Sequence, residues 1–154
     1  MLPASSQRVP SHTARHIKRK IRQDTERDIA CTALQGHEAI NERLEALDRE
    51  WDIERTLEAN AATISLIGLA LGSTKSRKWY LLPAVVAGFL LQHATQGWCP
   101  PVPIFRRFGF RTRTEIDYER YALKAMRGDF RDAPKAPDRG DGESVTRLMD
   151  AVKH

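Results

Sequence analysis

Hydrophobic residues are concentrated in the middle of the chain, and their spacing predicts helices. Between residues 37 and 58, apolar positions recur every three or four residues among many charged ones, which is typical of an amphipathic helix. Two stretches with very little charge follow, at 57–74 and 79–98, and they favour two apolar helices joined by a short basic turn. We therefore expect an all-α fold with a helical hairpin, residues 57–98, at its centre.

The segments after the hairpin are predicted to be polar and only partly helical. Residues 99–128 should form a Cys-Pro turn and then a surface helix. The start of that helix is indicated by Thr112-x-x-Glu115, which has the form of a capping box, and Gly128 should end it. Residues 129–154 are rich in Pro, Gly and Asp at first, so we expect a linker followed by a short C-terminal helix.

The basic residues are distributed in blocks around the hairpin. Ten Lys and Arg precede it and twelve follow it, against three in its turn, out of 25 in the chain. Basic residues favour the cytoplasmic side of a membrane, so this count predicts two inner-membrane spans with both termini in the cytoplasm. The bilayer would then be a partner, with Trp79, Tyr80 and Trp98 as anchors at its interfaces. A soluble hairpin buried against another chain is the competing interpretation.

Residues 1–36 are predicted to form a basic arm that is mostly disordered, because their hydrophobic residues do not recur at a regular spacing. We expect the arm to contact anionic lipid. The residues expected to make this contact are Arg15, Lys18, Arg19, Lys20 and Arg22. Binding of nucleic acid by the same residues, or a role as a targeting segment, are alternatives that the pattern leaves open.

Small residues one turn apart occur in both arms of the hairpin. The pairs are Gly68-x-x-x-Gly72 and Ala84-x-x-x-Gly88. Small residues let helix backbones approach closely, so these four positions are predicted to be helix-packing sites. We expect the hairpin to form a homodimer or a higher homo-oligomer.

The turn formed by Gly97, Cys99 and Pro100 is the one candidate for chemistry. Arg106 and Arg107 follow closely and would favour a thiolate at Cys99, the nucleophilic form of cysteine. The alternative is a small apolar residue in a tight turn. We interpret His93 as an interfacial polar residue rather than a ligand, and we assign no catalytic residue, metal or cofactor.

The string Gly97-Trp98-Cys99-Pro100, the segment Phe108-Gly109-Phe110-Arg111-Thr112 and the preceding hairpin resemble the YgaP-like transmembrane family, largely a domain of unknown function. The resemblance covers about residues 54–128 and implies an inner-membrane hairpin. In the best-known relative a rhodanese domain precedes such a hairpin, and the hairpins pair as a dimer. The segment before the hairpin is too short here for a rhodanese domain, so the resemblance does not imply sulfurtransferase activity.

These observations lead to one main hypothesis and two alternatives. The main hypothesis is a small integral inner-membrane protein that acts as a self-associating scaffold or accessory module. The first alternative is a membrane-surface protein that handles sulfur or redox equivalents through Cys99. The second is a soluble, basic, helical protein that binds nucleic acid.

Overall fold

The computed structural model describes residues 8–131, and within that range the only regular secondary structure is helical. The all-α prediction is therefore confirmed. The chain divides into two compact units, which are described separately below. Within the described residues, unit 1 comprises 8–25 and 50–116, and unit 2 comprises 26–49 and 117–131.

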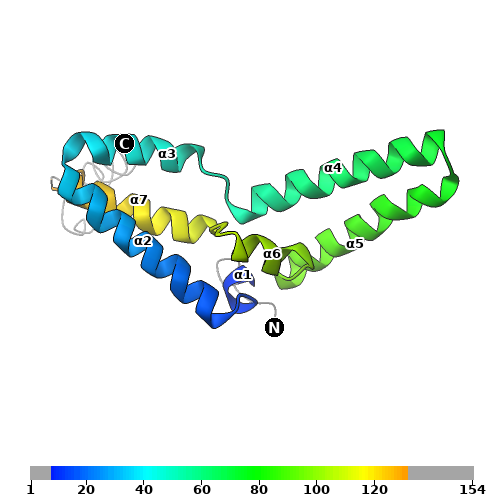
Figure 1. Ribbon diagram of the computed structural model, residues 1–154, viewed down its shortest axis with the longest axis horizontal. Helices are drawn as coiled ribbons and strands as arrows, with labels where there is room; N and C mark the ends of the chain where they lie inside the picture. The colour runs from blue at the N-terminus through cyan, green and yellow to red at the C-terminus, as the bar shows by residue number, and fades with distance from the viewer. Residues whose placement is uncertain (1–7, 132–154) are drawn as a thin grey trace, which may run out of the picture. The chain divides into compact units, whose positions relative to one another are not determined.

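Figure 1 shows the helices in chain order. They are α1 (Arg8–Ser11), α2 (Arg15–Gln35), α3 (His37–Arg49), α4 (Ile53–Thr74), the 3-10 helix η2 (Arg77–Tyr80), α5 (Leu81–Gln96), α6 (Pro101–Arg107) and α7 (Arg113–Arg127).

Helix α2 lies in the segment that we expected to be mostly disordered. Its buried residues are Ile17, Ile21, Thr25 and Ile29, spaced four residues apart along one side of the helix. One buried residue per turn gives this otherwise polar sequence a face that packs, and tertiary packing is what usually stabilises a helix of weak intrinsic propensity. The four-residue spacing of these buried residues is hard to recognise in the sequence because one of them, Thr25, is polar.

The helix expected over residues 37–58 is interrupted. α3 ends at Arg49 and α4 begins at Ile53. Asp52 is the N-cap of α4, since its side chain accepts a hydrogen bond from the backbone N–H of Arg55 at 2.8 Å. Trp51 lies in the break and is exposed.

In unit 1, α4, η2 and α5 form an antiparallel helical hairpin, with the two long helices side by side (Figure 1). Gly68 and Gly72 of α4 face the second arm. A Cβ atom added at Gly68 would lie 2.7 Å from Cδ of Pro83, and one added at Gly72 would lie 2.8 Å from the ring of Tyr80. The absence of side chains at these two glycines therefore sets how closely the arms approach.

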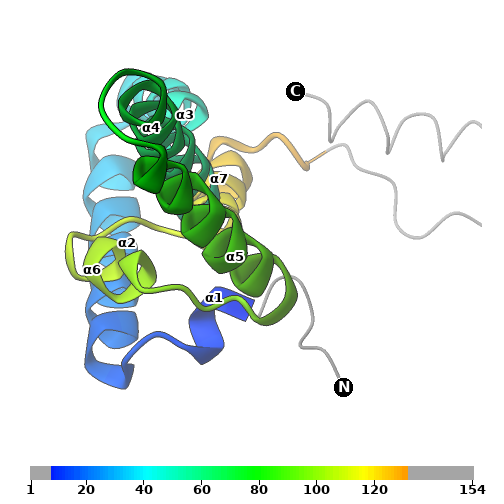
Figure 2. The same cartoon turned by 90° about the vertical axis from the view of Figure 1, so that its right-hand side faces the viewer.

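The turn after α5 follows the prediction for Gly97. This residue is left-handed (φ 78°), and its N–H donates to the carbonyl of His93 at 2.7 Å, which ends the helix. Helix α1 lies against this turn, so an added Cβ at Gly97 would collide with Arg8 (Figure 2). α6 then begins at Pro101, where a missing N–H costs little.

A small hydrophobic core joins α1, α4 and the segment around α6 in unit 1. Phe105 and Phe110 pack against it and make an edge-on contact, with ring centroids 5.5 Å apart. Its buried members are Val9, Ile53, Leu57, Cys99 and Val102.

The start and end of α7 also follow the sequence. The N–H of Thr112 donates to Oε2 of Glu115 at 2.8 Å, and the N–H of Glu115 donates to the hydroxyl of Thr112 at 3.4 Å. This is the predicted capping box. Gly128, at φ 96°, follows the last helical residue, Arg127, as expected.

Unit 2 contains the apolar stripe predicted for α3, because Ile40, Leu44 and Leu47 are buried. Leu123 of α7 is also buried. The C-terminal helix expected within 129–154, and all of that segment beyond residue 131, lie outside the described residues.

The predicted localisation is wrong. Among the helices of residues 8–131, none is both long enough and apolar enough to cross a membrane. α5 has 16 residues and rises about 24 Å, less than the roughly 30 Å of a hydrocarbon core. α4 has 22 residues, but Glu54, Arg55 and Glu58 occupy its first turns. The two-span inner-membrane topology is therefore withdrawn, and the assignment of both termini to the cytoplasm loses its basis.

Candidate functional site

The hairpin exposes an unusual amount of apolar surface. Nine of its large hydrophobic side chains are between 40% and 69% exposed. They are Leu66, Ile67, Leu69, Trp79, Tyr80, Leu81, Val85, Phe89 and Leu91. Scattered exposed hydrophobic residues are ordinary, but a concentration of them on one structural element is typical of an interaction surface.

One row of exposed residues on α5 has a regular arrangement, and we call it the outer stripe. It consists of Leu81, Ala84, Gly88 and Leu91, all exposed and spaced three, four and three residues apart. This spacing places them on one face of the helix. The large residues stand at the two ends and the small ones in the middle, where a Cβ added at Gly88 would meet nothing within 4 Å.

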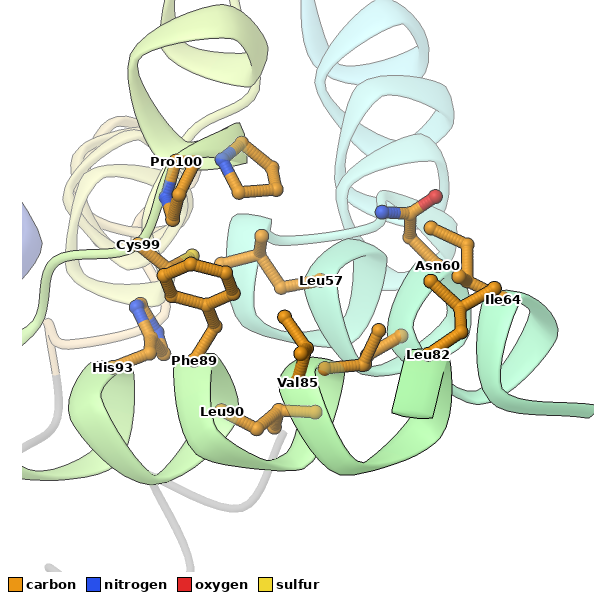
Figure 3. Close-up of a pocket in the computed structure, with 13 residues that line it drawn as sticks. Leu57, Asn60, Ile64, Leu82, Val85, Phe89, Leu90, His93, Cys99 and Pro100 are labelled. Carbon is orange, nitrogen blue, oxygen red and sulfur yellow. The ribbon is translucent and has the colours of Figure 1, made fainter. Parts of the chain in front are cut away.

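The hairpin also encloses an apolar cleft of about 300 Å³ at the end nearest Cys99 (Figure 3). Both long helices contribute to its walls, and the Cys99–Pro101 segment adds to one end. The residues that line it are Leu57, Asn60, Ala61, Ile64, Leu82, Val85, Val86, Phe89, Leu90, His93, Cys99, Pro100 and Pro101. Almost all of these are apolar.

His93 is the notable polar residue of the cleft. It is buried, at 6% exposed, and its Nε2 lies 2.6 Å from Oε2 of Glu54 in the first turn of α4. The other ring nitrogen, Nδ1, is buried and has no hydrogen-bond partner among the described residues. Our interpretation of His93 as an interfacial residue is therefore wrong. No local pattern indicates its pairing with Glu54, because the two residues are 39 positions apart in the chain.

The environment of Cys99 does not favour a thiolate, and of the two interpretations of this residue it favours the small apolar residue in a tight turn. Burial raises the pKa of its thiol, a hydrogen bond from the backbone of Val102 opposes this in part, and the negative charge of Glu54 raises it further. Arg106 makes its contacts elsewhere. Cys99 instead belongs to the hydrophobic core of unit 1, whereas Cys31 is exposed.

Arg106, only 1% exposed, connects three segments of unit 1. Its guanidinium makes two hydrogen bonds to the carboxylate of Glu115, both at 2.7 Å. It also donates to the hydroxyl of Thr13 at 3.1 Å and to the carbonyl of Phe110 at 2.8 Å. These contacts stabilise the entry into α7 because Glu115 is also half of the capping box.

The other residues predicted to be functional lie in ordinary surroundings. The five basic residues expected to contact anionic lipid are exposed on α2. Trp79 and Tyr80 belong to η2, where the Tyr80 hydroxyl lies 3.0 Å from that of Ser73, and Trp98 is half-buried. Their expected role as interface anchors depended on the withdrawn topology. In the described part of the chain, no three His, Cys, Asp or Glu residues are grouped so as to hold a metal ion.

Comparison of the chain with protein-family models, with curated proteins and with solved structures finds no match to any of them.

Proposed function

We propose that this chain is a self-associating helical scaffold or accessory module, in which two copies pair through the outer stripe of α5. The observation that carries the proposal is the exposed apolar surface of the hairpin. An ordinary monomer rarely concentrates so many exposed large apolar side chains on one structural element. A second copy of the chain provides an equally apolar surface of the same shape.

The order of residues along the outer stripe supports pairing of the chain with itself. The stripe is symmetric about position 86: Leu81 and Leu91 are equally distant from it, and so are Ala84 and Gly88. Two such helices laid antiparallel about a two-fold axis would place each large residue opposite a large one and each small residue opposite a small one. Two-fold symmetry is the commonest arrangement of homo-oligomers, and it requires a self-complementary patch.

The small residues at the centre of the stripe allow the two helices to approach closely. A side chain at Gly88 would keep the backbones apart, and none is present. The distribution of charge also favours contact, because no Asp, Glu, Lys or Arg occurs between Lys78 and Arg106. Pairing along α5 therefore buries no unpaired charge. The resemblance to a family whose best-known member pairs through its hairpin points in the same direction.

Other candidate functions have less support. A reactive thiol at Cys99 is disfavoured by the raised pKa and by the burial of this residue. The exposed basic residues of α2 are compatible with an anionic partner but select none.

The test is the oligomeric state of the full chain, measured by sedimentation velocity over a range of concentrations. We expect the unaltered chain to form dimers. Leu91→Glu should abolish pairing, because it places two carboxylates in an apolar interface. The matched control is Leu34→Glu, which changes an even more exposed leucine (88%) on α2 and should leave the dimer intact.

A second substitution tests the antiparallel register. In this register, position 81 of one copy meets position 91 of the other, so adding Leu81→Lys to Leu91→Glu should restore pairing through opposite charges. A parallel arrangement would bring like charges together and give no rescue. A chain that remains monomeric at every concentration, or one that Leu34→Glu disrupts as strongly as Leu91→Glu, contradicts the proposal.

A further inference from the structure

The apolar cleft contains an unsatisfied polar atom that the outer stripe does not explain. More than nine-tenths of buried polar groups in proteins find a hydrogen-bond partner. His93 is 94% buried by its 6% exposure, yet its Nδ1 has no partner in residues 8–131. Figure 3 shows the imidazole at the same end of the cleft as Cys99. His93 is one of the residues that line the cleft, so a molecule bound there lies next to this imidazole.

The contact with Glu54 determines which kind of partner Nδ1 requires. An ionised carboxylate can only accept hydrogen bonds, so Nε2 carries the proton that it donates to Oε2 of Glu54 over 2.6 Å. In the neutral imidazole, Nδ1 then presents a lone pair. For the neutral ring, the partner that Nδ1 lacks is a hydrogen-bond donor such as a hydroxyl group.

The walls of the cleft determine the rest of the ligand. They are formed mainly by side chains such as Leu57, Ile64, Val86 and Phe89, which favour an apolar body. A volume of about 300 Å³ accommodates about ten water-sized groups, which corresponds to a molecule of about ten non-hydrogen atoms. A carboxylate ligand would bring a second negative charge close to Glu54, so a neutral head group fits better.

We infer that this cleft binds a small apolar alcohol or phenol, whose hydroxyl group donates a hydrogen bond to Nδ1 of His93 while its hydrocarbon body fills the space between α4 and α5. The inference is independent of self-association, since the cleft is lined by the facing sides of the two helices and the outer stripe is not part of its wall.

Three probes that differ only in the polar group provide the test: thymol, its methyl ether, and p-cymene, which lacks the oxygen. Binding to the full chain is measured by calorimetry at about pH 8, where an ordinary imidazole is neutral. We expect thymol to bind with one molecule per chain and about fivefold more tightly than either of the others, the usual value of one net hydrogen bond. Thymol alone should shift the 15N resonance of His93 Nδ1.

Two substitutions locate the site. His93→Phe keeps a ring but removes the acceptor, so thymol should lose its fivefold advantage while p-cymene still binds. His37→Phe, at an exposed histidine of α3, is the matched control and should change nothing. Ala61→Leu fills the cleft from α4 and should weaken all three probes together.

Several outcomes would overturn the inference. Equal binding of thymol and p-cymene without a shift of Nδ1 would mean that His93 does not select the ligand. Tighter binding of 4-isopropylbenzoate than of thymol would replace the hydroxyl group by a carboxylate. Absence of binding up to the solubility limit of thymol would show that the cleft takes no such molecule. The probe series on the unaltered chain decides these points even if His93→Phe does not fold.

Discussion

The hairpin of unit 1 and the α3–α7 pair of unit 2 both bring two helices together, but with different interactions. In the hairpin, Gly68 and Gly72 let the backbones of α4 and α5 approach, and the contacts are almost entirely apolar. In unit 2, long side chains connect the helices. Arg43 of α3 makes two hydrogen bonds to the carboxylate of Glu119 on α7, at 2.7 and 3.2 Å, and Glu119 is fully buried.

The two pairs of helices should therefore respond to different kinds of substitution. Apolar contact between close backbones is sensitive to added volume, because a tightly packed interface cannot absorb an extra methyl group. A buried ion pair is sensitive to the loss of one partner, because the remaining charge is left in a poorly solvated site.

The largest effect is expected from Arg43→Met, which removes the guanidinium beside a buried carboxylate. We expect a loss of about 3 kcal/mol in the free energy of unfolding, measured by urea denaturation followed by circular dichroism. The control is Arg49→Met on the same helix. Arg49 pairs with Glu45 on the surface, where both side chains are more than 70% exposed (77% and 74%), so its loss should cost about 0.5 kcal/mol or less. Equal losses in both variants would remove the distinction.

In the hairpin, Gly68→Ala and Gly88→Ala should have opposite signs. The first places a methyl group 2.7 Å from the ring of Pro83, which should destabilise the chain by about 1–3 kcal/mol. The second adds a methyl group in open space and should stabilise α5 by up to about 1 kcal/mol through helix propensity. Thermal unfolding at a concentration too low for self-association compares them. A loss in both would show that the outer stripe is packed within one chain.

A smaller effect is expected from Thr112→Ala, which removes one half of the capping box of α7. The cost should be about 1 kcal/mol, the usual value for an N-cap side chain. Thr63→Ala, at an exposed position of α4, serves as the control for a lost threonine hydroxyl. Urea denaturation of both variants should show a clear loss for Thr112→Ala alone.

The smallest effect is a change in the pH dependence of stability caused by Glu115→Gln. Burial alone would raise the pKa of Glu115, but the hydrogen bonds from Arg106 and Thr112 outweigh it and lower the pKa overall. The folded state thus binds its proton at lower pH than the unfolded state. The stabilisation that ionised Glu115 provides is complete above the pKa of this residue in the unfolded state, about 4.3. It is lost as the pH falls through the pKa of Glu115 in the folded state.

Glu115→Gln can keep the capping hydrogen bond to Thr112. It removes the carboxylate that pairs with Arg106 and, with it, the titration. Its free energy of unfolding should therefore fall less steeply than that of the unaltered chain between about pH 5 and the acid limit of folding. Glu45→Gln, at an exposed position of α3, should retain the original slope. An unchanged slope in Glu115→Gln would mean that its ion pair with Arg106 contributes nothing in acid.

The features that could be predicted from the sequence depend on residues that lie close together in the chain. Gly97 and Gly128 end helices because each adopts a left-handed conformation. Thr112 and Glu115 cap α7 because they stand three residues apart. The two arms of the hairpin were visible because they lack charge. Each of these signals lies within a few turns of helix, which is the range over which a pattern specifies its own structure.

The features that the sequence did not predict depend on residues far apart in the chain. Arg43 meets Glu119 across 76 positions, and nothing near either residue indicates the other. The burial of Arg106 and His93 has the same origin. The membrane prediction failed for a different reason: it relied on the absence of charge and on the flanking basic residues, whereas the helices have to be both long and apolar over a whole span.

The symmetry of the outer stripe limits the size of any assembly built on it. Leu81 and Leu91 exchange places when α5 is turned end over end, so two copies that meet there use the same surface completely on both sides. Nothing of the stripe is left over to recruit a third copy. An assembly of this kind stops at two, whereas a head-to-tail contact between unlike surfaces would keep growing into a fibre.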